Sequence, residues 1–178
     1  PTGWKFSIQA VNAALTEITL GLASAGTAGY DFGLDAFAPP EPPQGYPPGL
    51  GEPYRTRRFK AGEDLYATIG IPREDKMSRL MQLARNYDFF GAPVGLFFYL
   101  DRSLGPPQWS DVGMYMQTVM LLAREHGLHT CAQEIWSLVP ATVGRFLEVP
   151  ANLLLFSGMA LGHADPSHPI NGLRTERA

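Results

Sequence analysis

The sequence predicts an α+β fold in which helices outnumber strands, and three observations support this prediction. The chain has 178 residues, a length that suits a single domain. Two nine-residue apolar runs, at 92–100 and 153–161, predict buried strands. Segments with apolar residues at helical spacing lie before and between these runs. We therefore expect one domain over residues 1–178, with strands and helices mixed along the chain.

The first 53 residues predict a strand, a helix and a long proline-rich segment. Apolar side chains alternate over residues 4–11, which indicates a half-buried strand. Asn12 is a good N-cap, and the residues after it follow helical spacing. Residues 37–53 contain seven prolines, which favour an extended chain without ladder hydrogen bonds. We interpret this segment as a strap across the domain, of the kind that lids active sites.

Three further helices are expected after the strap. A helical stretch follows the basic segment 54–60, and a clearer one ends near Gly91. A short helix is expected from Pro140, which suits a first turn, to Leu147. The clearer stretch has its apolar residues at i, i+3, i+4 and i+7, namely Met77, Leu80, Met81, Ala84 and Tyr87.

The segment from Ser110 to His126 predicts a long helix with almost no polar face. Ser110 can cap its start, and Gly127 can end it in the left-handed conformation. A helix that is apolar all round must be enclosed by a large core or by a partner subunit. One domain of this size has little room to enclose it, so we expect an obligate dimer with this helix at the seam.

Composition excludes several classes of function. The formal net charge of −3 argues against general nucleic-acid binding. No apolar run approaches the ~20 residues that a membrane helix needs, and no signal peptide opens the chain, so we expect a cytoplasmic protein. The single cysteine, Cys131, excludes an internal disulfide and is expected to be a small core residue. The four histidines do not form a recognisable metal motif, and no metal is expected.

Two segments are candidates for a binding site. Residues 127–136 follow the long helix in a short turn, and such turns can present successive backbone N–H groups to an electronegative ring edge. In the tail, Arg174 and Arg177 are three residues apart and can converge on one phosphate. Spacing alone leaves an ordinary connection and a solvated tail as equally good interpretations. A basic cluster at 55–60 is better explained as a solvated surface.

Four stretches in this order resemble the FMN-dependent nitroreductase family. They are Phe89-Phe-Gly-Ala-Pro-Val-Gly, Gly105-Pro-Pro-Gln-Trp-Ser-Asp-Val-Gly, Gly127-Leu-His-Thr-Cys-Ala-Gln-Glu, and Gly158-Met-Ala-Leu-Gly leading to Asn171-Gly-Leu-Arg-Thr-Glu-Arg. Each stretch is weak alone, but together they cover about residue 54 to the end. The resemblance implies an α/β sandwich with a central, mostly antiparallel sheet flanked by helices, in an intertwined homodimer with FMN at the interface.

The resemblance also implies roles for particular residues. The segment formed by Ala132, Gln133, Glu134 and Ile135 matches the turn whose backbone faces the flavin N5 and O4 edge. Arg174 and Arg177 match the cations on the phosphate side. In this family the cofactor performs the redox step, so no catalytic side chain is expected.

Two N-terminal segments of the family do not occur in this sequence. One is a phosphate-binding segment of the type Arg-Arg-Ser-x-Arg, and the other is a segment that contains Asn-x-Gln-Pro. Here Pro1-Thr-Gly-Trp4 runs directly from the glycine to the tryptophan. We therefore expect this sequence to be part of a longer polypeptide and to lack some of its N-terminal residues.

The expected function is transfer of hydride from NAD(P)H via FMN to nitroaromatic, quinone or similar electron-poor acceptors. An alternative is a flavin-poor relative that binds or sequesters a ligand. A third possibility keeps the flavin but changes the chemistry, for example to reductive dehalogenation or ene-reduction. The strap at 37–53 is the candidate for discriminating among small aromatic substrates.

Overall fold

The computed structural model describes residues 49–175. The expected strand at 4–11, the helix from Asn12, most of the strap at 37–53 and Arg177 lie outside these residues. The described α-helices are α2 (Tyr54–Thr68), α3 (Lys76–Ala84), α4 (Pro106–Glu125) and α5 (Pro140–Leu147). The strands are β1 (Val94–Asp101), β2 (His129–Gln133) and β3 (Leu153–Gly162), and the 3-10 turns are η1 (Arg85–Gly91), η2 (Glu134–Leu138) and η3 (Pro169–Gly172).

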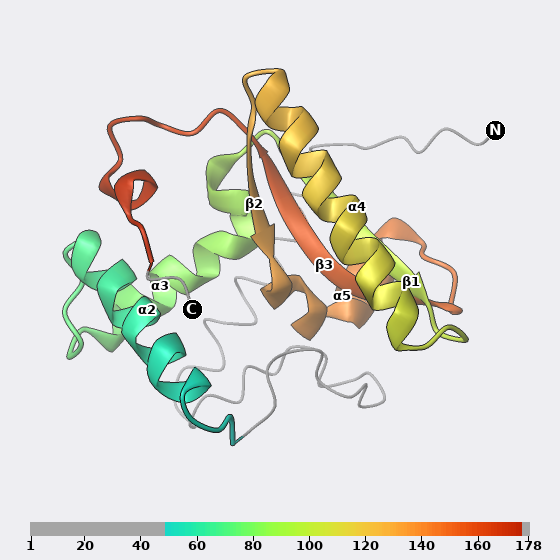
Figure 1. Ribbon diagram of the computed structural model, residues 1–178, viewed down its shortest axis with the longest axis horizontal. Helices are drawn as coiled ribbons and strands as arrows, with labels where there is room; N and C mark the ends of the chain where they lie inside the picture. The colour runs from blue at the N-terminus through green and yellow to red at the C-terminus, as the bar shows by residue number, and fades with distance from the viewer. Residues whose placement is uncertain (1–48, 176–178) are drawn as a thin grey trace.

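The three described strands form one antiparallel sheet in the order β1-β3-β2. In Figure 1, β3 lies at the centre, and α4 runs along the sheet beside it. The register pairs Val94 with Leu161 and Gln133 with Gly158. The prediction of an α+β fold with an antiparallel sheet is confirmed, and the two apolar runs are strands within two residues of the predicted bounds. The short helix α5 has its predicted bounds.

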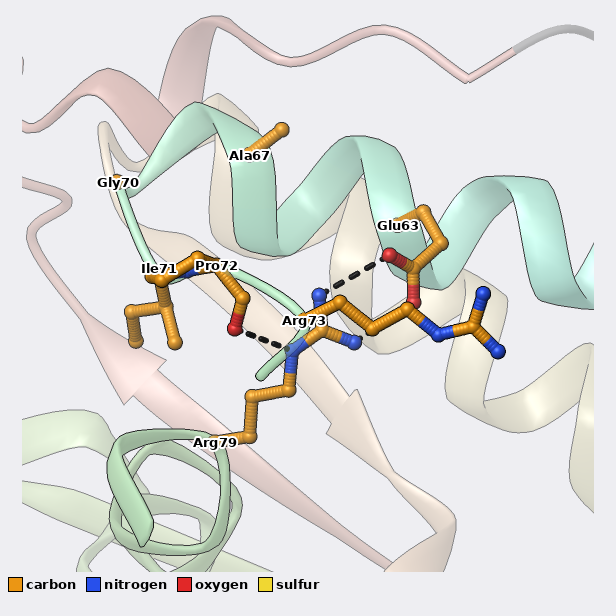
Figure 2. A pocket seen from close by; sticks show the side chains of 7 residues that line it. All are labelled: Glu63, Ala67, Gly70, Ile71, Pro72, Arg73 and Arg79. Carbon is orange, nitrogen blue, oxygen red and sulfur yellow. Dashed lines mark hydrogen bonds and ion pairs between the residues drawn. The ribbon is translucent and has the colours of Figure 1, made fainter. Parts of the chain in front are cut away.

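Helices α2 and α3 are held together by one arginine. Nη1 and Nη2 of Arg79 donate to the two carboxylate oxygens of Glu63, at 2.6 and 3.0 Å. Nε of Arg79 donates to the backbone oxygen of Pro72, and its guanidinium lies 4.3 Å from the centre of the Tyr66 ring. Figure 2 shows Arg79, Glu63 and Pro72 beside a pocket of about 410 Å³ between the helices. The pair lowers the pKa of Glu63 and raises that of Arg79.

The clearer helical stretch ends earlier than predicted. The α-helix stops at Ala84, and Tyr87 lies in the 3-10 turn η1 rather than on the helix. Two bulky residues of this turn, Phe89 and Phe90, have φ of 47° and 54°, in the left-handed region. Gly95 makes room for this arrangement, because a Cβ there would overlap the Phe89 ring. Apolar spacing alone did not reveal this change of backbone.

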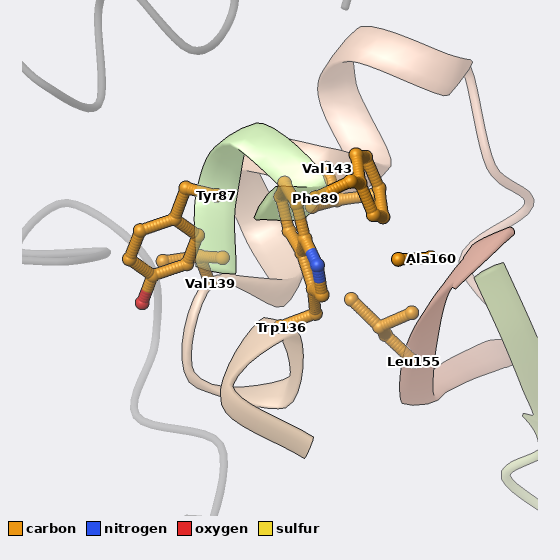
Figure 3. Close-up of a cluster of buried hydrophobic side chains, with 7 residues drawn as sticks. All are labelled: Tyr87, Phe89, Trp136, Val139, Val143, Leu155 and Ala160. Atoms are coloured by element: carbon orange, nitrogen blue, oxygen red, sulfur yellow. The ribbon is translucent and has the colours of Figure 1, made fainter. Parts of the chain in front are cut away.

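Two hydrophobic clusters cover the two faces of the sheet. The smaller cluster consists of Phe98, Met116 and Met159, and it joins the sheet to α4. The larger one gathers residues from η1, η2, α5 and β3 around Trp136 (Figure 3). Its buried members are Tyr87, Phe89, Trp136, Val139, Val143, Leu155 and Ala160.

Helix α4 begins before its predicted cap. It starts at Pro106, Gly105 is its N-cap, and no side chain caps it, so the assignment of Ser110 as the cap was wrong. Proline suits the first turn because its missing N–H would have had no partner in the helix. The predicted stop at Gly127 is confirmed: its φ is 73°, and Leu128 N–H donates to the oxygen of Ala123.

The described residues leave one face of α4 exposed. Only Met116 and Ala123 of this helix are buried. Met114 and Leu121 are seven residues apart, as are Tyr115 and Leu122, so the four share one face of the helix. All four are 52–62% exposed. An exposed apolar face of this kind is typical of a surface that a partner covers.

Candidate functional site

The candidate turn lies where β2 ends and η2 begins. Ala132 and Glu134 are exposed, Ile135 is half-buried and Gln133 is buried, so the chain alternates outward and inward here. No side chain caps the start of η2. The first N–H groups of a helical turn have no partner within it, so they remain able to donate to a ligand. This segment is called the ring-edge turn below, and it comprises Ala132–Ile135.

A buried side chain anchors the ring-edge turn to η1. Nε2 of Gln133 donates to the backbone oxygen of Asn86 at 2.8 Å and to its Oδ1 at 3.3 Å. Oε1 of Gln133 is buried and has no hydrogen-bond partner in the described part of the chain. The sequence identified Gln133 as part of the site, but it gave no sign of Asn86, which lies 47 residues earlier.

Aromatic rings hold the residue that follows the turn. The Trp136 ring stacks on Phe89 with centroids 4.8 Å apart, and it meets Tyr87 and Phe97 edge-on at 5.2 and 4.9 Å. The backbone of Gly158 allows this packing, because a Cβ there would overlap the indole. The sequence analysis missed Trp136 as a support of the site. A possible signal was its place directly after the candidate turn.

The tail holds its arginine close to its own backbone. Nη1 of Arg174 donates to the backbone oxygens of Asn171 and Leu173, at 3.1 and 2.9 Å. Arg174 is exposed, and within residues 49–175 it has no acidic partner. The turn η3, just before it, contacts α2, so the tail returns toward that helix (Figure 1). No hydrogen bond among the described residues joins Arg174 to the ring-edge turn.

The basic cluster at 55–60 lies on the exposed start of α2. Arg55 pairs with Glu52, and Lys60 pairs with Asp64, both at 2.7 Å. All the partners in these pairs are well exposed, so the pairs add little to stability. The cluster therefore fits the solvated surface favoured by the sequence.

Cys131 is not the core residue that the sequence predicted. It lies in β2, which pairs with β3 alone among the described strands, and both Cys131 and Ala132 are exposed there. Partial desolvation around the sulfur nevertheless raises the pKa of the thiol. A raised pKa keeps the thiol protonated and unreactive at neutral pH, which argues against a nucleophile here.

Two other classes of site find no support in the part of the chain that the structure describes. No group of three histidine, cysteine, aspartate or glutamate side chains is placed to hold a metal ion there. No helix of residues 49–175 has the length and apolar character needed to cross a membrane. The candidate chemistry therefore rests on the ring-edge turn and on the tail arginine.

The arrangement has the donors that an electron-rich, planar group with an anionic end requires. Uncapped amides at the start of η2 suit an electronegative ring edge, and an arginine without an acidic partner suits an anionic group. None of the side chains of the ring-edge turn is an obvious acid or base held against another titratable group. The site thus offers binding and polarisation rather than proton transfer by a side chain.

Comparison with known proteins identifies relatives of this chain. Residues 52–163 match the family model described as the nitroreductase family. The chain is 39% identical over 131 residues to a 4-nitrobenzoate reductase of Pseudomonas putida. It is 40% identical over 133 residues to a nitrobenzene nitroreductase of Ectopseudomonas oleovorans. These matches cover 74% and 75% of this chain and 58% of each relative, so the chain spans little more than half their length.

Solved structures share the fold. One is the FMN and NADPH-dependent nitroreductase NfnB from sphigopyxis sp. strain HMH, with a TM-score of 0.80 and 43% identity. That match covers 96% of this chain and 70% of the other. Another is the FMN-dependent nitroreductase NfnB from Mycobacterium smegmatis in complex with NADPH, with a TM-score of 0.79 and 28% identity. That match covers 97% of this chain and 72% of the other.

Proposed function

Because this chain belongs to the nitroreductase family, we propose that it is a flavin-dependent oxidoreductase. It would use FMN to carry electrons from NAD(P)H to nitroaromatic, quinone or similar electron-poor acceptors. The ring-edge turn carries this proposal: a segment whose sequence matches the family's flavin-facing turn lies at the end of β2, with Ala132 and Glu134 exposed and no side chain capping the start of η2. The relatives named for nitrobenzoate and nitrobenzene support a nitroaromatic acceptor.

The residues present fit FMN in their chemistry. The start of η2 has no side-chain cap, so its amides are free to donate to the electronegative edge of a flavin. Arg174 has no acidic partner within the described residues, so its charge is available to a phosphate. Arg177, outside those residues, would act on the same phosphate by its match to the family tail.

The protein's contribution is to bind and orient. When bound, FMN supplies the two-electron redox chemistry. The amides of Ala132–Ile135 would hold its ring edge and favour the electron-rich form of the ring. In the net first step, one NAD(P)H and one proton reduce a nitro group to a nitroso group, releasing water and NAD(P)⁺. No side chain of this chain is assigned as an acid or base.

A homodimer is part of the proposal. The apolar face of α4 formed by Met114, Tyr115, Leu121 and Leu122 is exposed in the single chain. A second copy that covers this face would remove these four apolar side chains from water. We also propose a cytoplasmic location, since the nicotinamide donor is a metabolite of the cell interior.

Anaerobic turnover tests the proposed activity. The purified chain is supplied with FMN, NADPH or NADH, and 4-nitrobenzoate, and the loss of nicotinamide absorbance is followed together with the nitro compound. The proposal predicts that each two-electron reduction of the acceptor consumes one nicotinamide. FMN-bound protein that oxidises no nicotinamide with any nitroaromatic or quinone would contradict it. Ligand binding without FMN or turnover would favour the alternative of a sequestering module.

A further inference from the structure

The side chain of Gln133 joins the ring-edge turn to η1. It points inward, whereas Ala132 and Glu134 beside it are exposed. Its Nε2 donates to the backbone oxygen of Asn86 at 2.8 Å. Asn86 is itself fixed, because its Nδ2 donates to the backbone oxygen of Leu83 at 2.9 Å. The side chain of Gln133, the last residue of β2, is therefore hydrogen-bonded to η1, which precedes β1 in the sequence.

A second attachment joins the same two segments. Trp136 of η2 stacks on Phe89 of η1, and Tyr87 of η1 meets its edge. The turn thus lies between a polar contact at Gln133 and an aromatic contact at Trp136. Two contacts on either side of Glu134 and Ile135 restrict how this short stretch of backbone can tilt.

This arrangement is unfavourable in several ways. Oε1 of Gln133 and Nε1 of Trp136 are both buried, and neither has a hydrogen-bond partner among residues 49–175. Phe89 and Phe90, which support the aromatic contact, have left-handed backbone conformations. A buried methionine in place of Gln133 would leave no unpaired acceptor on its side chain. Unsatisfied groups and strained residues of this kind gather where geometry is fixed for function.

We propose that Gln133 is a positioning residue, whose side-chain amide fixes the orientation in which the amides of the ring-edge turn meet the cofactor. This inference rests on the proposed function, and it assigns the side chain a different role from the backbone of the same residue. The Gln133 side chain acts through Asn86 rather than by touching the ring. Without this hydrogen bond, the turn would retain its sequence but would present its amides less consistently.

Gln133→Met in the full chain tests the proposal. Methionine has a similar length and fills the buried space, but it cannot donate to the Asn86 carbonyl. We expect the FMN dissociation constant to rise about tenfold, corresponding to the loss of one good hydrogen bond's effect. We expect the flavin midpoint potential to become more negative, because misaligned donors stabilise the reduced ring less. In FMN-free protein, the amides of Glu134 and Ile135 should exchange hydrogen faster.

Two further variants separate positioning from general stability. Val143→Ala removes volume from the same core cluster without touching the Gln133 hydrogen bonds, so it should lower Tm while leaving the potential unchanged. Asn86→Ala keeps the backbone acceptor, so its effect on the potential should be smaller than that of Gln133→Met. If Gln133→Met leaves the FMN dissociation constant, the flavin midpoint potential and the amide hydrogen exchange unchanged, that result by itself overturns the inference. Equal shifts in Gln133→Met and Val143→Ala would also overturn it, in favour of a structural role.

The same measurements distinguish this inference from the proposed function. If the unsubstituted chain binds no FMN, the proposed function fails and the positioning role fails with it. If the unsubstituted chain binds FMN, and Gln133→Met has the same FMN affinity, midpoint potential and amide exchange, only the positioning role fails.

Discussion

Tyr99 shows how a single buried hydroxyl affects the response to pH. Its OH is buried and has no hydrogen-bond partner among the residues that the structure describes, and burial raises the pKa of Tyr99 to about 12 from 10.0. The unfolded chain therefore loses this proton at a lower pH than the folded protein. Because the folded pKa is the higher one, the contribution of Tyr99 to stability is complete below pH 10 and is lost as pH rises toward 12.

Tyr99→Phe should therefore stabilise the protein slightly and reduce its sensitivity to alkali. Removing an unpaired buried hydroxyl should leave the free energy of unfolding unchanged or raise it by about 1 kcal/mol at pH 7. Denaturant unfolding would show that the free energy of unfolding of Tyr99→Phe decreases less between pH 7 and pH 11 than that of the parent chain. A clear loss of stability at pH 7 would indicate that the hydroxyl has a partner in solution.

Gly158 is required because a ring occupies the place of its side chain. Gly158→Ala would put a methyl group into the Trp136 indole, and overpacking of a core costs about 1–3 kcal/mol. The free energy of unfolding of Gly158→Ala, measured in urea, should therefore fall by about 1–3 kcal/mol. Gly144→Ala is the matched control: it lies in α5 with no atom near its Cβ position, so it should stabilise by about 0.5–1 kcal/mol. Equal effects of the two substitutions would refute this explanation.

Residue identity alone predicted some positions and not others. Gly127 was identified as a helix stop because many helices end in a left-handed residue, and glycine adopts that conformation readily. Cys131 was assigned to the core on its residue type, yet it is exposed in β2. The hydrogen bond between Gln133 and Asn86 links segments 47 residues apart, so no local pattern indicates it.

Among the elements, α4 makes the clearest prediction. Leu121→Glu places a charge on the exposed apolar face of this helix, where the side chain is 62% exposed in the single chain. If a second copy covers this face, the variant must bury that charge, so sedimentation should show a dimer converted to monomer at micromolar concentration. Met77→Glu, at a 67% exposed methionine of α3, is the matched control and should remain dimeric. A parent chain that sediments as a monomer would contradict the proposed dimer.

Element types were predicted better than element ends. Apolar runs identified β1, β3 and α4, because burial makes a continuous stretch apolar, and Pro140 identified the first turn of α5. The start of α4 was misjudged because the proline at its first turn replaced the expected serine cap. The end of α3 was misjudged because the apolar spacing continues into η1, where the backbone tightens to a 3-10 turn.

On the scale of the molecule, the antiparallel order of the sheet was implied by the family resemblance rather than by the residues. Strand order β1-β3-β2 depends on which of several apolar surfaces pair, and local sequence does not determine that choice. The described residues bring the ring-edge turn, η1 and the core around Trp136 into one region. The positions of the strap and of Arg177 relative to this region stay predictions.

The central claim is that the chain binds FMN through main-chain amides and a tail arginine. The most direct measurement is a titration of the purified chain with FMN, followed by the flavin's visible spectrum. The account predicts saturation near one FMN per chain, with a changed spectrum and a weaker dissociation constant in Arg174→Ala. The account would be contradicted if the flavin spectrum stays unchanged throughout the titration and if the chain is colourless after excess FMN has been removed by gel filtration.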